Sequence, residues 1–475
     1  MVTSMEYRER IKAMRPNVYL DGEIVPRDDP RIVPGMNVIA LTYDLAQDPR
    51  HENVFTAISH LSGEKINRFC HVHQSTDDLL KKQEMTRLYC HHSGGCIQRC
   101  MGIDAINALS VITYEVDQAH GTEYNQRFVA YLKVFQEKDL CANCAQTDVK
   151  GDRKRRPHEQ VDPDLYLRVI ERNKHGIVVR GAKAHNTIAP YADEIIVLPT
   201  RSLTEEEGDW AVAFAVPADT EGIKLICRPA SYRSRKEIHA PIENFGDVES
   251  FTIFDDVLVP WERVFLCGER EFGGPLALLF ALYHRHSYTG CKPATSDVLM
   301  GMAALAAEYN GIEDAKHVQH KLADMISVAE LVYAAGIAAS VKGRRAPSGT
   351  YMPDIVFSNV GRRHAGENIY HEYQIVADLA GGLAATLPLE GDFLSEETGP
   401  LVAKYLMRNP AISAEDQYRC FRLINDAICS SMGGVHQIAG LHGGGSPVME
   451  IIALLSNYDI QAKKAIAKRL AGIAS

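Results

Sequence analysis

The residue pattern of the chain changes twice along its length, and this order limits the folds that it can adopt. From residue 1 to about 150, apolar residues recur with the helical period, and Ser75 or Thr76 is placed to cap a helix. From about 151 to 275, short β-branched runs alternate with turn residues, which is typical of a sheet or barrel. Long helical patterns return after that. The sequence therefore predicts an α+β fold with domains at 1–150, 151–275 and 276–475.

Composition narrows the class of protein further. The chain has 475 residues, of which 46% are hydrophobic and 24% charged, which suits a globular protein of two or three domains. A formal net charge of -10 offers no attraction to nucleic acid or to an anionic membrane surface. The N-terminus lacks the apolar core of a signal peptide, and no run reaches the roughly 18 apolar residues that span a bilayer. We therefore expect a cytoplasmic protein that binds neither nucleic acid nor membranes.

Two of the cysteine-containing segments have the spacing of a ligand site. The chain holds eleven cysteines, an odd and scattered set that does not indicate a disulfide framework. In YHRHSYTGCK, at the expected start of a long helix, His284, Tyr288 and Cys291 stand at i, i+4 and i+7 and share one helical stripe. In GGCIQRCMG, Cys96 and Cys100 stand at i and i+4, again at the expected start of a helix. Three thiolates and one imidazole suit tetrahedral zinc or an iron–sulfur cluster, and buried structural thiols are the competing interpretation.

Other motifs have simpler interpretations. The pair Cys141 and Cys144 has C-x-x-C spacing, but no second pair completes a zinc site, so we expect a structural role. His71 and His73 alternate on a strand or loop, where surface or hydrogen-bonded positions are more common than metal binding. The run KGDRKRRPHEQ is typical of a solvated loop. The glycine-rich strings AGGLAATLP and HGGGSP indicate close backbone approach to a cofactor or a neighbouring subunit, and neither matches a Rossmann fingerprint.

Segments spread over essentially the whole chain carry a family resemblance. They are, in chain order, INRFCHVHQSTDDLLKK, CIQRCMGIDAINA, TDVKGDR, DPDLYLRVIE, GIVVRGAKAHNT, FDDVLVPWERVFLC, YHRHSYTGCK, AALAAEYNG and HGGGSP. This sequence resembles the 4-hydroxybutyryl-CoA dehydratase family, within a wider group that includes the flavin-dependent 4-hydroxyphenylacetate 3-monooxygenases. The resemblance implies an acyl-CoA dehydrogenase-like fold with an N-terminal helical domain, a central β domain and a C-terminal helical bundle.

The resemblance also implies the cofactors and the chemistry. It implies FAD and a 4Fe-4S cluster, whose ligands match Cys96, Cys100, His284 and Cys291, with an acyl-CoA substrate and a homotetramer or dimer of dimers. In a 4-hydroxyacyl-CoA the thioester acidifies the α-proton but not the β-proton, so simple elimination stalls. The implied mechanism is a transient one-electron oxidation by FAD with the cluster as a Lewis acid on the leaving hydroxyl, and vinylacetyl-CoA isomerase activity accompanies it. His284 is expected to be both ligand and base.

Further site positions follow from the resemblance, residue by residue. Groups that orient the substrate or handle protons are Gln98, Tyr288, Lys292 and Glu249. Groups expected near FAD are Gln146, Asp148, Lys150, Arg153, Thr187, Gly381 and Gly382. For Thr187 and the aspartate and glycine of TDVKGDR, the competing interpretation is that they only form turns before strands.

Two departures from the family pattern bear on the substrate. Gln146 stands where the family has methionine, and Ala439 stands where it has a catalytic glutamate three residues before the histidine of HGGGSP. We hypothesise that His436 takes part of the role of that glutamate. Three alternatives stay open: a flavin-dependent aromatic hydroxylase, a related radical dehydratase or isomerase with another acyl-CoA, and a catalytically silent scaffold subunit.

Overall fold

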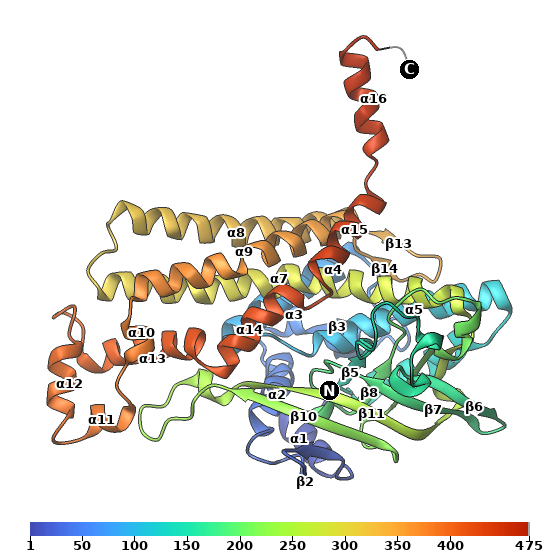
Figure 1. Cartoon of the computed structure of the whole chain (residues 1–475), viewed down its shortest axis with the longest axis horizontal. Helices are drawn as coiled ribbons and strands as arrows, with labels where there is room; N and C mark the ends of the chain where they lie inside the picture. The colour runs from blue at the N-terminus through green and yellow to red at the C-terminus, as the bar shows by residue number, and fades with distance from the viewer. Residues whose placement is uncertain (474–475) are drawn as a thin grey trace.

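A computed structural model describes residues 1–473 as a bundle of long helices packed beside two β-sheets (Figure 1). The α+β, acyl-CoA dehydrogenase-like fold is confirmed. The helices are α1 Ser4–Lys12, α2 Val33–Gln47, α3 Glu52–Phe55, α4 Thr76–Ser93, α5 Cys100–His120, α6 Tyr124–Glu137, α7 Gly273–Tyr309, α8 Lys316–Val341, α9 Ile355–Ala380, α10 Leu383–Thr386, α11 Glu390–Leu394, α12 Gly399–Leu406, α13 Ala414–Cys429, α14 Ser431–His442, α15 Pro447–Asn457 and α16 Ile460–Leu470.

The strands form two main sheets and two small hairpins. The strands are β1 Val18–Leu20, β2 Glu23–Val25, β3 Thr56–Ile58, β4 Lys65–Asn67, β5 Ala142–Ala145, β6 Arg168–Asn173, β7 Gly176–Lys183, β8 Glu194–Val197, β9 Val212–Pro217, β10 Ile223–Ser231, β11 Gly246–Pro260, β12 Val264–Cys267, β13 Arg344–Arg345 and β14 Tyr351–Met352. One sheet has the order β2-β1-β10-β11-β7-β6, and the other has the order β12-β9-β8-β5.

Both main sheets take strands from before residue 150. The strands β1 and β2 extend the larger sheet through a parallel pairing of β1 with β10, and β5 pairs in parallel with β8 in the smaller sheet. The first helix of the C-terminal bundle, α7, begins at Gly273. The division of the chain into domains at residues 150 and 275 stays a prediction.

The helix ends follow local chemistry. Ser75 is the N-cap of α4, and its hydroxyl accepts a hydrogen bond from the Asp78 amide, so one of the two expected caps is confirmed. Helix α4 ends at Gly94, whose φ of 69° lies in the left-handed region that favours glycine. The polar stretch that begins at Tyr283 does not start a helix, because it lies about three turns inside α7.

Helix α7 tolerates a proline next to a candidate ligand because a neighbouring side chain compensates for it. Pro293 cannot donate a hydrogen bond to the carbonyl of Thr289, four residues earlier. Gln83 of α4 donates to that carbonyl instead, at 3.0 Å. The two helices also approach closely at Gly290, where an added Cβ would lie 1.8 Å from Thr86 Oγ1. Glycine and proline together therefore bring α4 against the ligand-bearing part of α7.

Two helical stretches pass a length-and-composition test for spanning a membrane. They are Lys316–Val341, which is α8, and Ser431–Asn457, which covers α14, a glycine-rich turn and α15. Core helices of soluble proteins pass the same test, and the absence of membrane binding stays a prediction. Helix α8 packs against both α7 and α9, and the three lie side by side in the bundle (Figure 1).

Helix α16 projects away from the rest of the molecule (Figure 1). No residue of α16 is buried, whereas α15, which precedes it, packs along α9. The apolar side chains Ile460, Ile466 and Leu470 of this arm are exposed.

Candidate functional site

The loop before α5 carries the first candidate ligand. Cys100 is the first residue of α5, but Cys96 lies in the loop before it, so the expectation that both cysteines stand on one helix is wrong. The physical reason is Gln98, whose φ of 55° is left-handed and breaks the helical path. The Gln98 side chain donates to the Gly246 carbonyl at 2.8 Å and accepts from the Tyr191 hydroxyl at 2.8 Å. Gln98 thus ties the loop to the start of β11.

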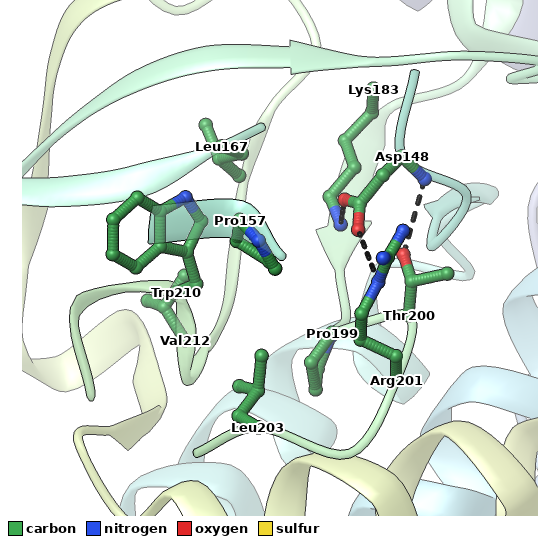
Figure 2. A pocket seen from close by; sticks show the side chains of 10 residues that line it. All are labelled: Asp148, Pro157, Leu167, Lys183, Pro199, Thr200, Arg201, Leu203, Trp210 and Val212. Atoms are coloured by element: carbon green, nitrogen blue, oxygen red, sulfur yellow. Dashed lines mark hydrogen bonds and ion pairs between the residues drawn. The ribbon is translucent and has the colours of Figure 1, made fainter. Parts of the chain in front are cut away.

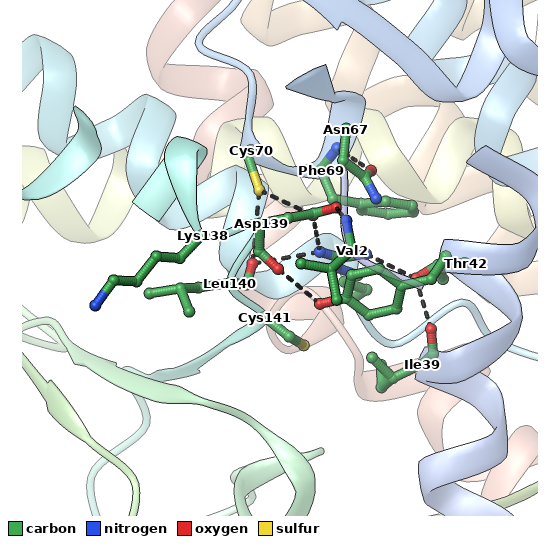
Figure 3. A network of polar contacts seen from close by, with 12 residues as sticks. Val2, Ile39, Thr42, Asn67, Phe69, Cys70, Lys138, Asp139, Leu140 and Cys141 are labelled. Atoms are coloured by element: carbon green, nitrogen blue, oxygen red, sulfur yellow. Dashed lines mark hydrogen bonds and ion pairs between the residues drawn. The ribbon is translucent and has the colours of Figure 1, made fainter. Parts of the chain in front are cut away.

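Arg99 anchors the same loop from the other side, through contacts with Asp139 and Thr42, both labelled in Figure 3. Its guanidinium donates to Asp139 Oδ1 at 3.0 Å and to Thr42 Oγ1 at 2.8 Å, and it lies 4.1 Å from the centre of the Tyr43 ring. Asp139 Oδ2 in turn accepts from the amide of Val2 at 3.2 Å. With Gln98 and Arg99 held on opposite sides, the positions of the two flanking cysteines are set by the fold itself.

Two of the four predicted ligands, Cys100 on α5 and His284 on α7, meet in a group with Asp104, and Cys96 and Cys291 act on each other and on this group. Ligand atoms of Cys100 and His284 lie within 4.8 Å of each other. Cys96 hydrogen-bonds to Cys100, and this contact, against the opposing effect of burial, lowers the pKa of the Cys96 thiol to about 6. Burial first, and then the charge of Cys96, raises the pKa of Cys291 to about 12. Three thiols whose pKa values depend on one another, together with an imidazole, fit a soft metal centre.

Asp104 and Lys82 belong to this site but were not found by sequence reasoning. The His284 Nδ1 is 2.8 Å from Asp104 Oδ2, and the Lys82 ammonium donates to Asp104 Oδ1 at 2.5 Å. Burial of the Asp104 carboxyl raises its pKa, but the Lys82 charge and the His284 contact outweigh that effect, so the pKa lies below its ordinary value. The available signal was Asp104 in CMGID, a carboxylate at i+4 from Cys100 in the apolar first turns of a helix.

The HGGGSP turn packs directly against the ligand helix. The Tyr288 hydroxyl donates to the Ala439 carbonyl at 3.2 Å, and a Cβ on Gly443 would lie 1.4 Å from that hydroxyl oxygen. Arg362 fixes the turn by donating to the Gly443 carbonyl at 2.9 Å, and its guanidinium lies 4.7 Å from the Tyr288 ring centre. The glycines here therefore permit a close approach to Tyr288 of the same chain.

His436 and Lys292 flank the site. The His436 ring lies beside Gly95: a Cβ added to Gly95 would be 2.9 Å from His436 Nε2. Burial, and then the charge of Lys292, lowers the pKa of His436 to about 4, so its imidazole is neutral at physiological pH. Lys292 Nζ lies 5.4 Å from the centre of the Tyr288 ring. Within residues 1–473, His436 Nε2 is buried without a hydrogen-bond partner.

Two carboxyl groups of β11 stand on the other side of the cysteine loop. Glu249 accepts a hydrogen bond from the Thr187 hydroxyl at 2.7 Å, which joins two of the predicted site residues. Burial raises the pKa of both carboxyls, and for Asp247 the charge of Glu249 adds to this; the charge of Arg228 opposes the shift in each case. Among the described residues, Asp247 Oδ1 and Glu249 Oε2 are buried without hydrogen-bond partners. These buried, unpaired oxygens suit contact with a polar group of a ligand.

The remaining positions expected near FAD are scattered. Asp148 pairs with Lys183 at 2.7 Å and with Arg201 at 3.8 Å, beside a cavity of about 10 Å³ that holds roughly one water molecule (Figure 2). Gln146 donates to the Ala277 carbonyl at 3.1 Å. The structure does not bring every expected residue to the cysteine loop: Lys150 and Arg153 are exposed on a loop, and Gly381 and Gly382 are exposed after α9.

A larger cleft lies at the end of α9. Its volume is about 420 Å³, and its lining includes Tyr373, Gly381, Cys429 and Gln437. Gln437 belongs to α14, the helix that also carries His436, and none of the four predicted ligands lines this cleft. Cys141 and Cys144, by contrast, are buried in and beside β5, consistent with the structural role expected for them.

Comparison with known proteins defines the family. The family models "4-hydroxyphenylacetate 3-hydroxylase N terminal" and "4-hydroxyphenylacetate 3-hydroxylase C terminal" match residues 3–266 and 274–472. The chain is 41% identical to 4-hydroxybutyryl-CoA dehydratase/vinylacetyl-CoA-Delta-isomerase of Clostridium aminobutyricum, over 100% of both chains. It superposes on an oxygen-tolerant archaeal 4-hydroxybutyryl-CoA dehydratase from N. maritimus with a TM-score of 0.95, at 38% identity, covering 100% of this chain and 95% of that one.

A more distant structure represents the wider group. The oxygenase component of 4-hydroxyphenylacetate 3-monooxygenase, in complex with FAD and 4-hydroxyphenylacetate, has a TM-score of 0.88 at 27% identity, covering 99% of this chain and 98% of that one. Fold and site together define an acyl-CoA dehydrogenase-like protein of the group that contains these oxygenases. Within it, the chain belongs to the 4-hydroxybutyryl-CoA dehydratase/vinylacetyl-CoA isomerase family. Its named relatives are enzymes, and the homology supports a dehydratase function.

Proposed function

We propose that the chain is an FAD- and 4Fe-4S-dependent dehydratase that converts a 4-hydroxyacyl-CoA of the 4-hydroxybutyryl-CoA type, with vinylacetyl-CoA isomerase activity. The observation that carries the proposal is the meeting of Cys100 and His284 in one group of possible metal ligands, with Cys96 in contact with Cys100 and Cys291 near Cys96. Full-length similarity to a dehydratase of this type supports it.

The donor set fits an iron–sulfur cluster. Three thiols and one imidazole suit such a cluster, and the lowered pKa of Cys96 favours a thiolate at neutral pH. An aromatic hydroxylase that uses reduced flavin and oxygen has no need for this set, so we favour the dehydratase over the hydroxylase. Buried Asp247 and Glu249, with unpaired oxygens, suit the polar edge of a flavin or a thioester substrate.

The mechanism assigns separate tasks to the cofactors and the chain. When bound, FAD supplies reversible one-electron oxidation of the substrate, and the cluster supplies Lewis acidity toward the leaving hydroxyl. His284 is the proposed exchangeable ligand, and its Nε2 would be the base when it is not bound to the cluster; the Tyr288 hydroxyl is oriented by the Ala439 carbonyl. The Thr187 hydroxyl, which donates to Glu249, positions a carboxyl group for proton transfer. The close packing of HGGGSP on Tyr288 excludes water from the reacting groups.

The position of Ala439 bears on which proton acceptors are available. Ala439 presents only its backbone at the Tyr288 hydroxyl. The neutral imidazole of His436, with a buried and unpaired Nε2 in the described structure, is the proposed proton acceptor on that side. A His436→Ala variant with full activity would remove this role. The second candidate function, favoured by Ala439, is a dehydratase or isomerase with the same cofactors and a different acyl-CoA substrate.

We propose that the active form is a homotetramer or dimer of dimers in the cytoplasm. The projecting α16 arm, with no buried residue, supports an assembly in which it docks on another copy. The net charge of -10 supports the absence of nucleic-acid binding, as proposed from the sequence.

The direct test is an anaerobic assay with purified protein. The proposal predicts conversion of 4-hydroxybutyryl-CoA to crotonyl-CoA and isomerisation of vinylacetyl-CoA, with both activities lost in Cys96→Ala. Hydroxylation of 4-hydroxyphenylacetate with reduced flavin and oxygen, without either acyl-CoA reaction, would contradict it. Turnover of another 4-hydroxyacyl-CoA alone would select the second candidate.

A further inference from the structure

A charged pair lies fully buried beside the ligand histidine. The side chains of Lys82 on α4 and Asp104 on α5 are both 0% exposed, and their charged atoms are 2.5 Å apart. Lys82 also donates to the carbonyl of Tyr283 on α7, at 2.9 Å. Removing two charges from water costs several kcal/mol per ion, so such a pair is weak as a device for stability alone. Its placement next to His284 indicates another purpose.

Asp104 accepts hydrogen bonds from Lys82, Ser287 and His284. Oδ1 accepts from Lys82 and from the Ser287 hydroxyl, the latter at 3.1 Å. Oδ2 lies 2.8 Å from His284 Nδ1 and accepts from the Ser287 hydroxyl at 3.1 Å. The single Ser287 proton is shared between the two oxygens, so three donors, from Lys82, Ser287 and His284, surround a carboxylate that has about four lone-pair positions. Asp104 is therefore occupied as a hydrogen-bond acceptor, although it lies within 4.8 Å of ligand atoms of Cys100 and His284.

The same contacts set the orientation of the imidazole. An ionised carboxylate at Nδ1 requires that this nitrogen carry the proton, which leaves Nε2 with its lone pair free. Two aromatic rings pack against the imidazole, because Phe280 stacks on it with centroids 5.5 Å apart and Tyr288 meets it in a T-shaped contact at 5.2 Å. Ring position and tautomer are both defined by neighbours that are present before any metal binds.

We propose that the Lys82–Asp104 pair is a positioning device that fixes His284 with its Nδ1 proton on Asp104 and its Nε2 directed to the metal. This inference rests on the proposed function. Asp104 acts through His284, and Lys82 acts through Asp104 by holding the carboxylate in place between α4 and α7. Partners of this kind typically change metal affinity by 10- to 100-fold when they are removed. Neither residue has another assigned role in the family site described above.

The test compares variants by how they hold iron. Asp104→Asn keeps the shape of the side chain but loses the charge, and Lys82→Met removes the counter-ion. The matched control is Asp426→Asn, which breaks a buried ion pair with Arg235 on another part of the chain. Each anaerobically purified protein is exposed to an iron chelator, and the rate of iron loss is followed. Pulsed EPR of the reduced protein reports the ¹⁴N coupling of the bound imidazole.

The outcomes separate the two claims. We expect iron loss to be roughly 10- to 100-fold faster in Asp104→Asn and Lys82→Met, with a weakened or altered ¹⁴N coupling, and a control that matches the wild type. Variants with wild-type iron loss and ¹⁴N coupling would overturn the positioning role and leave the proposed function intact. A wild-type protein that binds no iron would overturn both. If Asp104→Asn does not fold, Ser287→Ala removes one hydrogen bond to Asp104 without a charge change, and the same direction with a smaller effect is expected.

Discussion

The anchor of the cysteine loop can be tested by removing one charge from its centre. Asp139→Asn removes the charge that faces Arg99, but asparagine keeps the size of the side chain and tolerates the left-handed φ of 46° at this position. The amide oxygen can still accept from Arg99, while the new amide N–H₂ group faces the Val2 amide, a donor that Asp139 Oδ2 now satisfies. The variant therefore removes charge pairing and one hydrogen bond without opening a cavity.

The size of the effect follows from burial. The side chains of Arg99 and Asp139 are 1% and 3% exposed, and their charged atoms lie 3.0 Å apart. At an effective dielectric constant of about 20, two unit charges at this distance attract by roughly 5 kcal/mol. Breaking a buried pair by removing one partner costs about 3–5 kcal/mol, because the remaining guanidinium stays buried without its counter-charge. We expect a loss in this range, which is a large part of the usual 5–15 kcal/mol of folding stability.

The assay is urea unfolding of the apoprotein, followed by circular dichroism, for the wild type, Asp139→Asn and a control. The control is Asp255→Asn, which breaks an ion pair with Lys224 whose side chains are 57% and 47% exposed. Exposed pairs contribute about 0–1 kcal/mol, so the control should unfold almost like the wild type. A loss of less than about 1 kcal/mol in Asp139→Asn would refute the claim that this network anchors the loop (Figure 3).

Three further perturbations have defined outcomes. Burial raises the pKa of the Glu372 carboxyl to about 7, from an ordinary 4.5. Its contribution to folding stability is therefore fully present below pH 4.5 and is lost as the pH rises through 7, a change of about 3 kcal/mol. Urea unfolding should show this pH dependence in the wild type but not in Glu372→Gln, and the same pH profile in both proteins would contradict it. Gly443→Ala places a Cβ 1.4 Å from the Tyr288 hydroxyl oxygen and should cost about 1–3 kcal/mol and most of the activity; wild-type melting and turnover would show that the turn is not closely packed. Tyr191→Phe loses the hydrogen bond to Gln98 and should lower stability by about 1 kcal/mol, measured by the same unfolding assay; no change would show that Gln98 needs no such partner.

The sequence predicted the order of the elements because periodicity reports which faces are buried. The helical pattern that begins after Ser75 and the alternating runs in β7 and β11 gave element types correctly. Pattern reasoning failed where a single backbone angle decides the outcome. The spacing of Cys96 and Cys100 is compatible with one helix, but the positive φ of Gln98 ends the helical path, and glutamine gives no signal for that conformation.

The candidate site was predictable only in part. The positions of His284 and Cys291 on one helical stripe follow from spacing, and Cys100 lies close to His284 as expected. The buried partners Lys82 and Asp104 come from two other helices, and nothing local to either residue shows that they face His284. The role of HGGGSP was also hidden, because its close contact is with Tyr288, more than 150 residues earlier. The Lys82–Asp104 pair beside His284 and the packing of HGGGSP on Tyr288 both depend on contacts between segments far apart in the sequence.

The central claim is that the four predicted ligands hold an iron–sulfur cluster in a flavoprotein. Protein purified without air should be analysed for iron, acid-labile sulfide and flavin per chain, together with its absorption spectrum, for the wild type and for Cys96→Ala and His284→Ala. The account predicts about four irons, about four sulfides and one FAD per chain, as the donor set of three thiolates and an imidazole requires, with iron and sulfide lost in Cys96→Ala and reduced in His284→Ala. Flavin without iron in protein never exposed to air would contradict the account and favour the aromatic hydroxylase.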